Sequence, residues 1–294
     1  MFCSLKNLSH LVHTIVMFKG PFSFSGNKSR IYKLYLQSTI SKFSRVHEPF
    51  IGSGVCLYNS VGGGIGLDID QNVVGLHRAL SIQDFPKMVL DKYNRFFRDP
   101  EGRKDSYYKL REDFNKSWKE EGLSSNNLDS LYILVQHSFN SLLRFGPNGF
   151  NVPWGDKKFD ISRIKEAQRI FLQKGIEVTH GDFRELDLDK IDRHRDLIYI
   201  DPPYIASKYQ YGGWTQQNDI EMFEWISLLD ELGYKFILSN TLKHRGEKNE
   251  LLHHFSEGLH TKVVKMTYNA WSARVKAVEK EYGTIEVLVS NFEL

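Results

Sequence analysis

The spacing of apolar positions changes several times along the chain, and each change marks an expected element. Residues 46–70 combine a short apolar strand, a glycine turn, a helix and a second strand, 64–67, that ends at Asp68. This order is the opening of a β-α-β unit. From residue 72 to 145 apolar side chains recur at helical spacing, most regularly over 128–142, and predict one helix after another.

The second half of the chain returns to alternating strands and helices. Glycines and prolines between 146 and 155 break the helical spacing and predict a loop or a small hairpin. An α/β sheet domain interrupted by a helical insertion accounts best for the whole order of elements. We expect strands at 176–180, 197–200, 235–239, 261–267 and 283–291, and helices at 161–174, 219–232 and 248–256.

Length, hydropathy and cysteine content narrow the class of protein. The 294 residues are 41% hydrophobic and 26% charged, an ordinary globular composition that excludes collagen-like and low-complexity chains. No apolar run reaches the roughly 18 residues that a membrane span needs, so we expect a soluble protein. Two cysteines, Cys3 and Cys56, are too few for a disulfide framework and favour a reducing, cytoplasmic compartment. Residues 1–17 lack an amphipathic period and are expected to form an N-terminal arm open to disorder.

The overall charge balance by itself says little about binding partners. A net charge of +3 is too small to indicate a nucleic-acid partner. Lys and Arg exceed Asp and Glu over residues 92–158 and 262–282, so these segments are candidate phosphate-facing surfaces. Mixed charge of this kind is also typical of a solvated helix face, and that interpretation stays open.

Four residues, Asp201, Pro202, Pro203 and Tyr204, follow the buried strand expected at 197–200. In open α/β sheets, ligands bind beyond the carboxyl ends of the strands. A carboxylate and a prolyl carbonyl can each accept one hydrogen of an adenine amine, and a tyrosine can stack on the base. These contacts would turn the lone pair of the amine nitrogen toward an electrophile. The alternative is a plain turn, because Asp-Pro-Pro is also good turn chemistry.

Two further patterns suggest a nucleotide-type site. In Glu48–Gly54 the glycines allow the backbone to approach a ligand, and Asp68 lies where a ribose-binding carboxylate is expected. Because no G-x-G-x-x-G is present, the pattern favours a nucleoside cofactor over a dinucleotide and argues against an oxidoreductase. Before the first strand, Lys28 is placed to reach a carboxylate and Phe24 to pack on a ring. The alternative for the glycine motif is tight strand-to-helix packing. The alternatives for the other two residues are that Phe24 is simply buried and that Lys28 is simply solvated.

In this order, the motifs resemble those of Dam-type N6-adenine DNA methyltransferases, the D12 class or alpha group. Two residues depart from the family pattern, Phe24 where Trp is common and Asn27 where Gly is common, and we expect altered packing around the cofactor there. The corresponding segments are Phe24–Lys28 for aromatic-x-Gly-x-Lys, Glu48–Gly54 for Glu-Pro-Phe-x-Gly-x-Gly, Asp68 for the acid after the second strand, Asp201–Tyr204 for the catalytic Asp-Pro-Pro-Tyr, and two insertion segments, 107–115 and 144–155.

The resemblance implies a fold, a reaction and a set of residues. The fold is a class I, Rossmann-like methyltransferase sheet, doubly wound with an antiparallel final hairpin, in which 18–71 and 159–294 form the catalytic domain and 72–158 an inserted helical DNA-recognition domain. The reaction is methyl transfer from S-adenosylmethionine to a flipped adenine in double-stranded DNA, with GATC as the first candidate target. Asp201, Pro202, Pro203 and Tyr204 are the implied catalytic residues, and Phe24, Lys28, Pro49, Phe50, Gly52, Gly54, Asp68 and Asp201 the implied cofactor-binding residues.

The resemblance also implies how the target sequence is bound. Phe139, Asn140, Arg144 and Pro153 match family positions near the target base pairs. Arg144 is the residue expected to make a bidentate contact to guanine, with a phosphate contact as the alternative. The basic loop 269–280 is expected to contact the DNA backbone unless its charges are simply solvated.

Other activities remain as alternatives at this stage. An N4-cytosine or other nucleic-acid amino-methyltransferase would use similar chemistry, and a catalytically inactive DNA-binding paralogue would keep the fold. Carbon-5 cytosine methylation needs a cysteine nucleophile, but neither cysteine follows a proline in a suitable loop. The histidines show no metal-site spacing, so we expect no metal. A bacterial or phage origin and a paired restriction endonuclease are further expectations from the resemblance.

Overall fold

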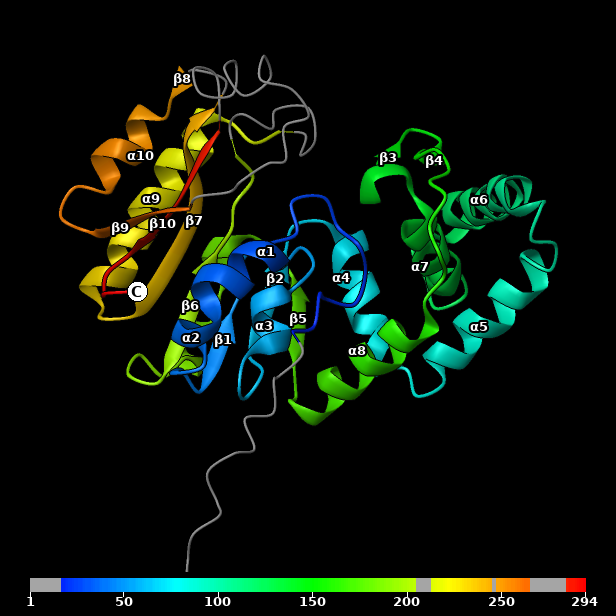
Figure 1. The fold of residues 1–294 in the computed structure, drawn as a ribbon, viewed down its shortest axis with the longest axis horizontal. Coiled ribbons are helices and arrows are strands. Elements are labelled where there is room, and N and C mark those ends of the chain that lie inside the picture. Colours follow the sequence, from blue (N-terminus) through cyan, green and yellow to red (C-terminus); the bar gives the residue numbers. More distant parts are fainter. Residues whose placement is uncertain (1–16, 205–212, 245–246, 265–283) are drawn as a thin grey trace, which may run out of the picture.

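The structure is a computed structural model that describes residues 17–204, 213–244, 247–264 and 284–294 (Figure 1). The expected N-terminal arm, apart from Met17, and the basic loop 269–280 lie outside these ranges. The strands are β1 (Arg45–His47), β2 (Ile65–Asp68), β3 (Phe145–Gly146), β4 (Gly149–Phe150), β5 (Glu177–His180), β6 (Asp196–Ile200), β7 (Lys235–His244), β8 (Glu247–Lys248), β9 (His260–Val264) and β10 (Ile285–Ser290).

Helices occupy most of the remaining described chain. A short π-helical stretch, Tyr32–Leu36, joins the first two helices into one helical segment. The α-helices are α1 (Ser29–Ile31), α2 (Gln37–Ile40), α3 (Val55–Asn59), α4 (Gln71–Arg78), α5 (Phe85–Phe96), α6 (Arg103–Glu121), α7 (Leu128–His137), α8 (Ile161–Gln173), α9 (Gln216–Glu231) and α10 (Glu250–Phe255). Short 3₁₀ turns lie at Ala79–Ser81, Phe139–Ser141, Phe183–Glu185 and Leu188–Lys190.

The central sheet is mixed, and its strand order follows from two sets of ladders. Strands β1, β6 and β7 pair in parallel, and β10 pairs antiparallel with both β7 and β9. Strands β2 and β5 pair in parallel, and a bridge from Glu48 to Gly66 joins β2 to the end of β1. The resulting order is β5-β2-β1-β6-β7-β10-β9. The predicted α/β sheet with an antiparallel final hairpin is therefore confirmed.

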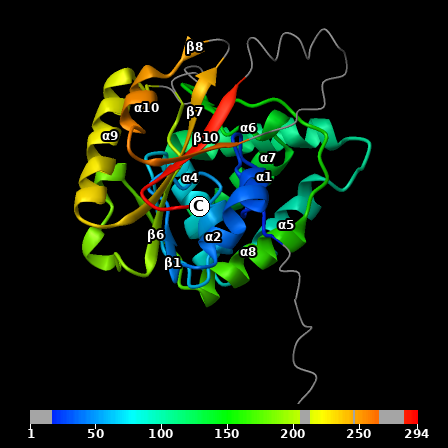
Figure 2. The ribbon, with the colours of Figure 1, turned by 60° about the vertical axis from the view of Figure 1, so that its left-hand side comes forward.

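Strand β6 lies at the centre of this order, and both of its faces are buried. Leu197 and Tyr199 pack with the segment that contains α1 and α2, whereas Ile198 and Ile200 pack with α9. Alternate side chains of a strand point to opposite faces, so a continuous apolar run is required here. Each such aliphatic side chain contributes about 1.5–3 kcal/mol when it is fully buried. Figure 2 shows α9 and α10 on one face of the sheet and α1 and α2 on the other.

The helices of the insertion form a lobe beside the sheet, at the right of Figure 1. Helices α5, α6 and α7 pack together and carry the small β3–β4 hairpin. Helix α4 contacts β2 and β5 as well as α7, so it connects the lobe to the sheet. Residues from α3, α4, α7 and α8 belong to one continuous apolar cluster, which gives the lobe and the sheet a shared core.

Two predicted boundaries differ from the structure for local reasons. Helix α9 begins at Gln216, earlier than predicted, because the Thr215 side chain caps it by accepting from the backbone N–H of Asn218. Strand β7 continues to His244 because both β10 and β8 pair with its last residues. Within the described ranges, no helix combines the length and the apolar character needed to cross a bilayer.

Candidate active site

The tip of β6 brings together three of the predicted site residues. Asp201 follows the strand directly, and its Oδ1 is 2.8 Å from the Nζ of Lys28, which begins the first helical segment. The Tyr204 hydroxyl donates to the same Oδ1 at 3.2 Å. The Lys28 ammonium also lies 4.8 Å from the centre of the Tyr204 ring, within range of a cation–π attraction. Among the described residues, the contacts of Lys28 and Tyr204 with the Asp201 carboxyl group both use Oδ1.

The two charges of this pair depend on each other. Burial lowers the pKa of Lys28, but the neighbouring charge of Asp201 more than offsets it, so the lysine stays protonated. Burial raises the pKa of Asp201, and Lys28 opposes that rise. Because the ammonium lies in contact with the carboxylate, the ionised pair is the state that the geometry favours. Pro202 is buried and Pro203 half-buried, which fixes the backbone that carries the carboxylate.

The segment that carries Lys28 is held from the far side by α8. Arg163 donates to the carbonyl oxygens of Gly20 and Phe22, at 2.7 and 2.6 Å, and to the Ser23 hydroxyl at 2.8 Å. A guanidinium that makes several hydrogen bonds to backbone is a strong and directional anchor. The position of Lys28 is thus set by contacts about 140 residues away in the sequence.

The glycine loop after β1 lies next to this anchored segment. Gly52 and Gly54 have φ values of 45° and 65°, which favour glycine. A Cβ on Gly52 would lie 3.2 Å from the Phe24 ring, and one on Gly54 would lie 2.9 Å from the Tyr58 ring. Phe24 and the loop are therefore in direct contact. The Asn27 side chain adds a second link, because its Nδ2 donates to Ser53 Oγ at 2.8 Å.

Hydrogen bonds hold the Gly52 peptide from both sides. Its N–H donates to Asp68 Oδ2 at 3.1 Å, and its carbonyl oxygen accepts from His77 Nε2 at 2.8 Å. Since a carbonyl only accepts, Nε2 carries the ring proton, and the Tyr58 hydroxyl donates to Nδ1 at 3.0 Å. Burial lowers the pKa of His77 to about 4, so the ring is neutral at physiological pH. Burial raises the pKa of Asp68 to about 6.

Glu48 is a buried acid at the start of the same loop. Its Oε2 accepts a hydrogen bond from the backbone N–H of Leu57 at 3.2 Å. Burial raises its pKa to about 8, and the charge of Asp201 adds to that rise. The carboxyl therefore carries a proton at neutral pH and can donate one hydrogen bond as well as accept.

The two other predicted cofactor residues have a packing role on the opposite side of the loop. The Phe50 ring stacks on Phe183 with centroids 5.4 Å apart and meets the edge of Trp214 at 5.6 Å. Pro49 is buried between β1 and the loop. Both residues shape the loop through its apolar contacts.

Three polar residues on β7 and β10, on the side of Tyr204, were not predicted from the sequence. Ser239 Oγ lies 3.3 Å from the Tyr204 hydroxyl, and Thr241 and Glu286 follow on β7 and β10. The available signal was a polar residue inside an otherwise apolar strand. Such a residue is costly to bury unless it is paired or faces a ligand.

The four predicted DNA-contacting residues lie on the helical lobe, near the β3–β4 hairpin. Phe139 is 51% exposed, and Asn140 and Ser141 have positive φ values of 52° and 59°. The Phe139 N–H donates to the carbonyl oxygen of Pro153 at 2.9 Å, which joins two of the four residues. The third, Asn140, is the exposed neighbour of Phe139.

Arg144, the fourth of these residues, is exposed at the base of the hairpin. Its Nε donates to Asn151 Oδ1 at 2.7 Å, which orients the guanidinium. None of the four residues lies in the cluster around Asp201. In Figure 1, the hairpin and β8, which follows β7, both lie at the top of the molecule.

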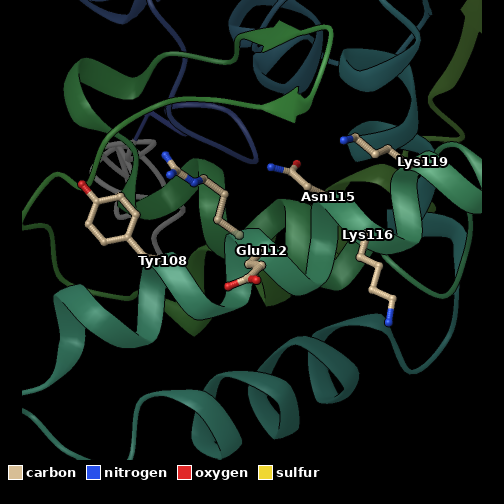
Figure 3. A pocket seen from close by; sticks show the side chains of 6 residues that line it. Tyr108, Glu112, Asn115, Lys116 and Lys119 are labelled. Atoms are coloured by element: carbon tan, nitrogen blue, oxygen red, sulfur yellow. The ribbon is translucent and has the colours of Figure 1, made fainter.

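A pocket of about 660 Å³ lies on α6 of the lobe (Figure 3). Asn115 Nδ2 donates to the carbonyl of Phe150 at 3.0 Å, and Lys119 donates to Asn148 at 3.2 Å. Helix α6 thus supports the hairpin, which explains the 107–115 motif without a catalytic role. The pocket is lined by Tyr108, Arg111, Glu112, Asn115, Lys116 and Lys119.

Comparisons with known proteins give a consistent family. Residues 24–270 match the model of the D12 class N6 adenine-specific DNA methyltransferases. The chain is 23% identical to the Type II methyltransferase M.FokI of Planomicrobium okeanokoites, over 93% of this chain and 43% of that protein. It is 26% identical to the Type II methyltransferase M.MjaIII of Methanocaldococcus jannaschii, over 83% of this chain and 87% of that protein. It is 27% identical to a DNA adenine methylase of Vibrio cholerae, over 72% and 73%. The chain spans less than half the length of several curated relatives that it matches.

Proposed function

The chain belongs to the D12 class of N6 adenine-specific DNA methyltransferases, and from this premise we propose that it methylates N6 of an adenine in double-stranded DNA with S-adenosylmethionine as methyl donor. The observation that carries the proposal is the Asp201 carboxylate at the tip of β6, which pairs with Lys28 at 2.8 Å through one of its two oxygens. Family membership supplies the reaction, and this geometry supplies a site suited to it.

The glycine loop fits the methyl donor. Gly52 and Gly54 leave no room for side chains next to Phe24 and Tyr58, so the loop backbone packs closely against these two rings. Asp68 and the loop would hold the nucleoside of S-adenosylmethionine, with Phe24 against its ring and Lys28 toward its carboxylate. The donor supplies an electrophilic methyl group bonded to a sulfonium.

The residues after β6 would hold the acceptor amine. Asp201 Oδ2 accepts one hydrogen of the adenine amine, and the Pro202 carbonyl accepts the other. Tyr204 stacks on the base, which has to leave the duplex to reach this depth. With both hydrogens held, the nitrogen lone pair is turned toward the methyl group, and catalysis consists mainly of orientation. Lys28 keeps the Asp201 carboxylate ionised and in place.

The helical lobe would bind the target sequence. Phe139 and Asn140 are exposed at a turn in which Asn140 and Ser141 have positive φ values, and Arg144, four residues after Asn140, is also exposed. Arg144 contacts a guanine, in a target for which GATC is the first candidate. Names of relatives that include Type II methyltransferases support pairing with a restriction endonuclease, in the cytoplasm of a bacterium or a phage-infected cell.

Identification of the methylated base tests the proposal. Unmethylated plasmid DNA is incubated with the protein and S-adenosylmethionine that carries a labelled methyl group, and the DNA is digested to nucleosides for mass analysis. We expect N6-methyladenine at one short sequence. If the label is found in N4-methylcytosine, the acceptor is the amine of cytosine and not that of adenine. Absence of label in DNA, with the donor still bound, would indicate a DNA-binding protein without activity.

A further inference from the structure

Strands β7 and β10 carry polar side chains that the proposed reaction does not use. Alternation along the strands places Ser239 and Thr241 on the face of the sheet that α1 and α2 cover, and Glu286 on the same face of β10. Thr241 and Glu286 are direct partners in the antiparallel register of these strands. Their side chains are therefore neighbours.

Each of the two residues has a buried oxygen without a hydrogen-bond partner in the described part of the chain. Within the described ranges, Thr241 Oγ1 and Glu286 Oε2 have no hydrogen-bond partner. Buried polar atoms in native folds are almost always paired, because the loss of water is otherwise uncompensated. Two such atoms on facing residues indicate a place where a polar ligand binds.

The pair lies within electrostatic range of the catalytic cluster. Lys28 and Asp201 both act on the Glu286 carboxyl, and Glu286 in turn acts on Tyr204. Burial raises the pKa of Glu286, which favours the acid form. In that form the carboxyl has an O–H that can donate to an acceptor.

The strand order determines on which side of Asp201 Thr241 and Glu286 lie. Strands β1 and β2, which carry the glycine loop and Asp68, lie on one side of β6, and β7 and β10 lie on the other. A methyl donor bound over the glycine loop leaves the region over β7 and β10 to the acceptor base. The unpaired atoms therefore lie on the acceptor side of Asp201.

On the basis of the methyl transfer proposed above, we propose that Thr241 and Glu286 form the subsite for the ring of the acceptor base. The Thr241 hydroxyl and the acid form of the Glu286 carboxyl donate hydrogen bonds to ring nitrogens. Asp201 and the Pro202 carbonyl already take both amine hydrogens. The ring nitrogens of a purine only accept, so they require groups that donate.

Substitutions at Glu286 test this subsite. We expect Glu286→Ala to lower kcat/KM for duplex DNA by about 10- to 100-fold, whereas its affinity for S-adenosylmethionine, measured by calorimetry, changes less than about twofold. Glu286→Gln keeps an N–H donor and should stay within about threefold of the wild type. Glu247→Ala, on exposed β8, is the matched control. Thr241→Val, which keeps the side-chain shape, gives an independent loss if Glu286→Ala fails to fold.

A substrate analogue identifies the partner atom. Duplexes with 1-deazaadenine or 7-deazaadenine at the target position each lack one ring nitrogen. With the analogue that lacks the nitrogen bound by Glu286, Glu286→Ala should have the same kcat/KM as the wild type. If Glu286→Ala lowers kcat/KM by the same factor with adenine and with both analogues, the proposal is overturned. An unchanged kcat/KM in Glu286→Ala would also overturn it. If Glu286→Gln is as impaired as Glu286→Ala, the carboxylate acts instead as a counter-charge to Lys28. If the wild type methylates no DNA at all, the proposed function itself fails.

Discussion

Around the glycine loop, polar groups are paired within the protein, whereas on β7 and β10, on the far side of Asp201, two buried oxygens lack a partner among the described residues. The Gly52 peptide is bonded at both ends, to Asp68 and to His77. Across the site, buried oxygens of Thr241 and Glu286 have no hydrogen-bond partner within the ranges that the structure describes. A site whose groups are paired in advance is ordered before its ligand binds, and a site with unpaired groups depends on its ligand to satisfy them.

This difference matches the two ligands of the proposed reaction, the methyl donor and the acceptor base. A cofactor is the same in every reaction cycle, so a rigid loop that presents backbone to it loses no affinity to rearrangement. In the proposed reaction the acceptor base is drawn out of a duplex, and unpaired donors and acceptors on its side of the site would help to offset the cost of unstacking it. Asp201 lies at the division between the two halves.

Substitution of Asp201 should have the largest effect. Asp201→Ala removes the acceptor for the amine hydrogen, and we expect the rate of methyl transfer to fall by about 10²- to 10⁴-fold in single-turnover assays. Cofactor binding should be largely retained, because the glycine loop does not rest on this side chain. Near-normal turnover in this variant would remove the carboxylate from the mechanism.

Substitution of Gly54 tests the rigidity of the glycine loop. Gly54→Ala would place a methyl group 2.9 Å from the Tyr58 ring at a φ of 65°, and we expect a loss of about 1–3 kcal/mol in the free energy of unfolding. Weaker binding of S-adenosylmethionine should accompany the loss. Gly175→Ala is the matched control, since its φ is 58° and no described atom lies within 4 Å of the added Cβ. If both variants lose the same stability in thermal or urea unfolding, only backbone strain matters at Gly54.

The buried acid of the loop predicts a pH dependence. The pKa of Glu48 is about 8 in the folded protein, above its ordinary value of 4.5. Between these values the folded state holds a proton that the unfolded state releases, so this contribution to stability is complete below pH 4.5 and is lost as the pH rises through 8. Glu48→Gln keeps the shape of the neutral acid and should flatten the slope of stability against pH, by up to about 1.4 kcal/mol per pH unit. An unchanged slope would mean that Glu48 ionises freely.

Sequence motifs identify the residues around the glycine loop and Asp201 more readily than the polar residues on β7 and β10. Phe24–Lys28, Glu48–Gly54 and Asp201–Tyr204 are short continuous runs, so their residues are recognisable before any fold is known. Thr241 and Glu286 become neighbours only through the register of β7 and β10. Register depends on which strands pair, and this is a property of the whole sheet.

The order of elements was predictable because apolar periodicity is local. The anchoring of the Lys28 segment was not, since Arg163 on α8 reaches carbonyl groups at Gly20 and Phe22. A basic residue on a predicted helix gives no sign of such a partner. The Thr215 cap of α9 was available as a local signal three residues before Asn218.

The smallest effect is expected from a substitution on the helical lobe. Arg144→Ala should reduce discrimination at one guanine by about 1–3 kcal/mol, measured as the ratio of kcat/KM for duplexes that differ at that base pair. Lys116→Ala, on the exposed side of α6, should leave the ratio unchanged. If Arg144→Ala weakens every sequence equally, Arg144 contacts a phosphate.

The central claim is that methyl donor and acceptor base occupy separate halves of the site, divided at Asp201. The most direct measurement is the affinity for S-adenosylmethionine, determined by calorimetry for Glu286→Ala and Gly54→Ala beside the wild type. We predict that Glu286→Ala binds the donor within about twofold of the wild type, whereas Gly54→Ala binds it at least about fivefold more weakly. The opposite order, with Glu286→Ala the weaker binder, would place the donor over β7 and β10 and contradict the account.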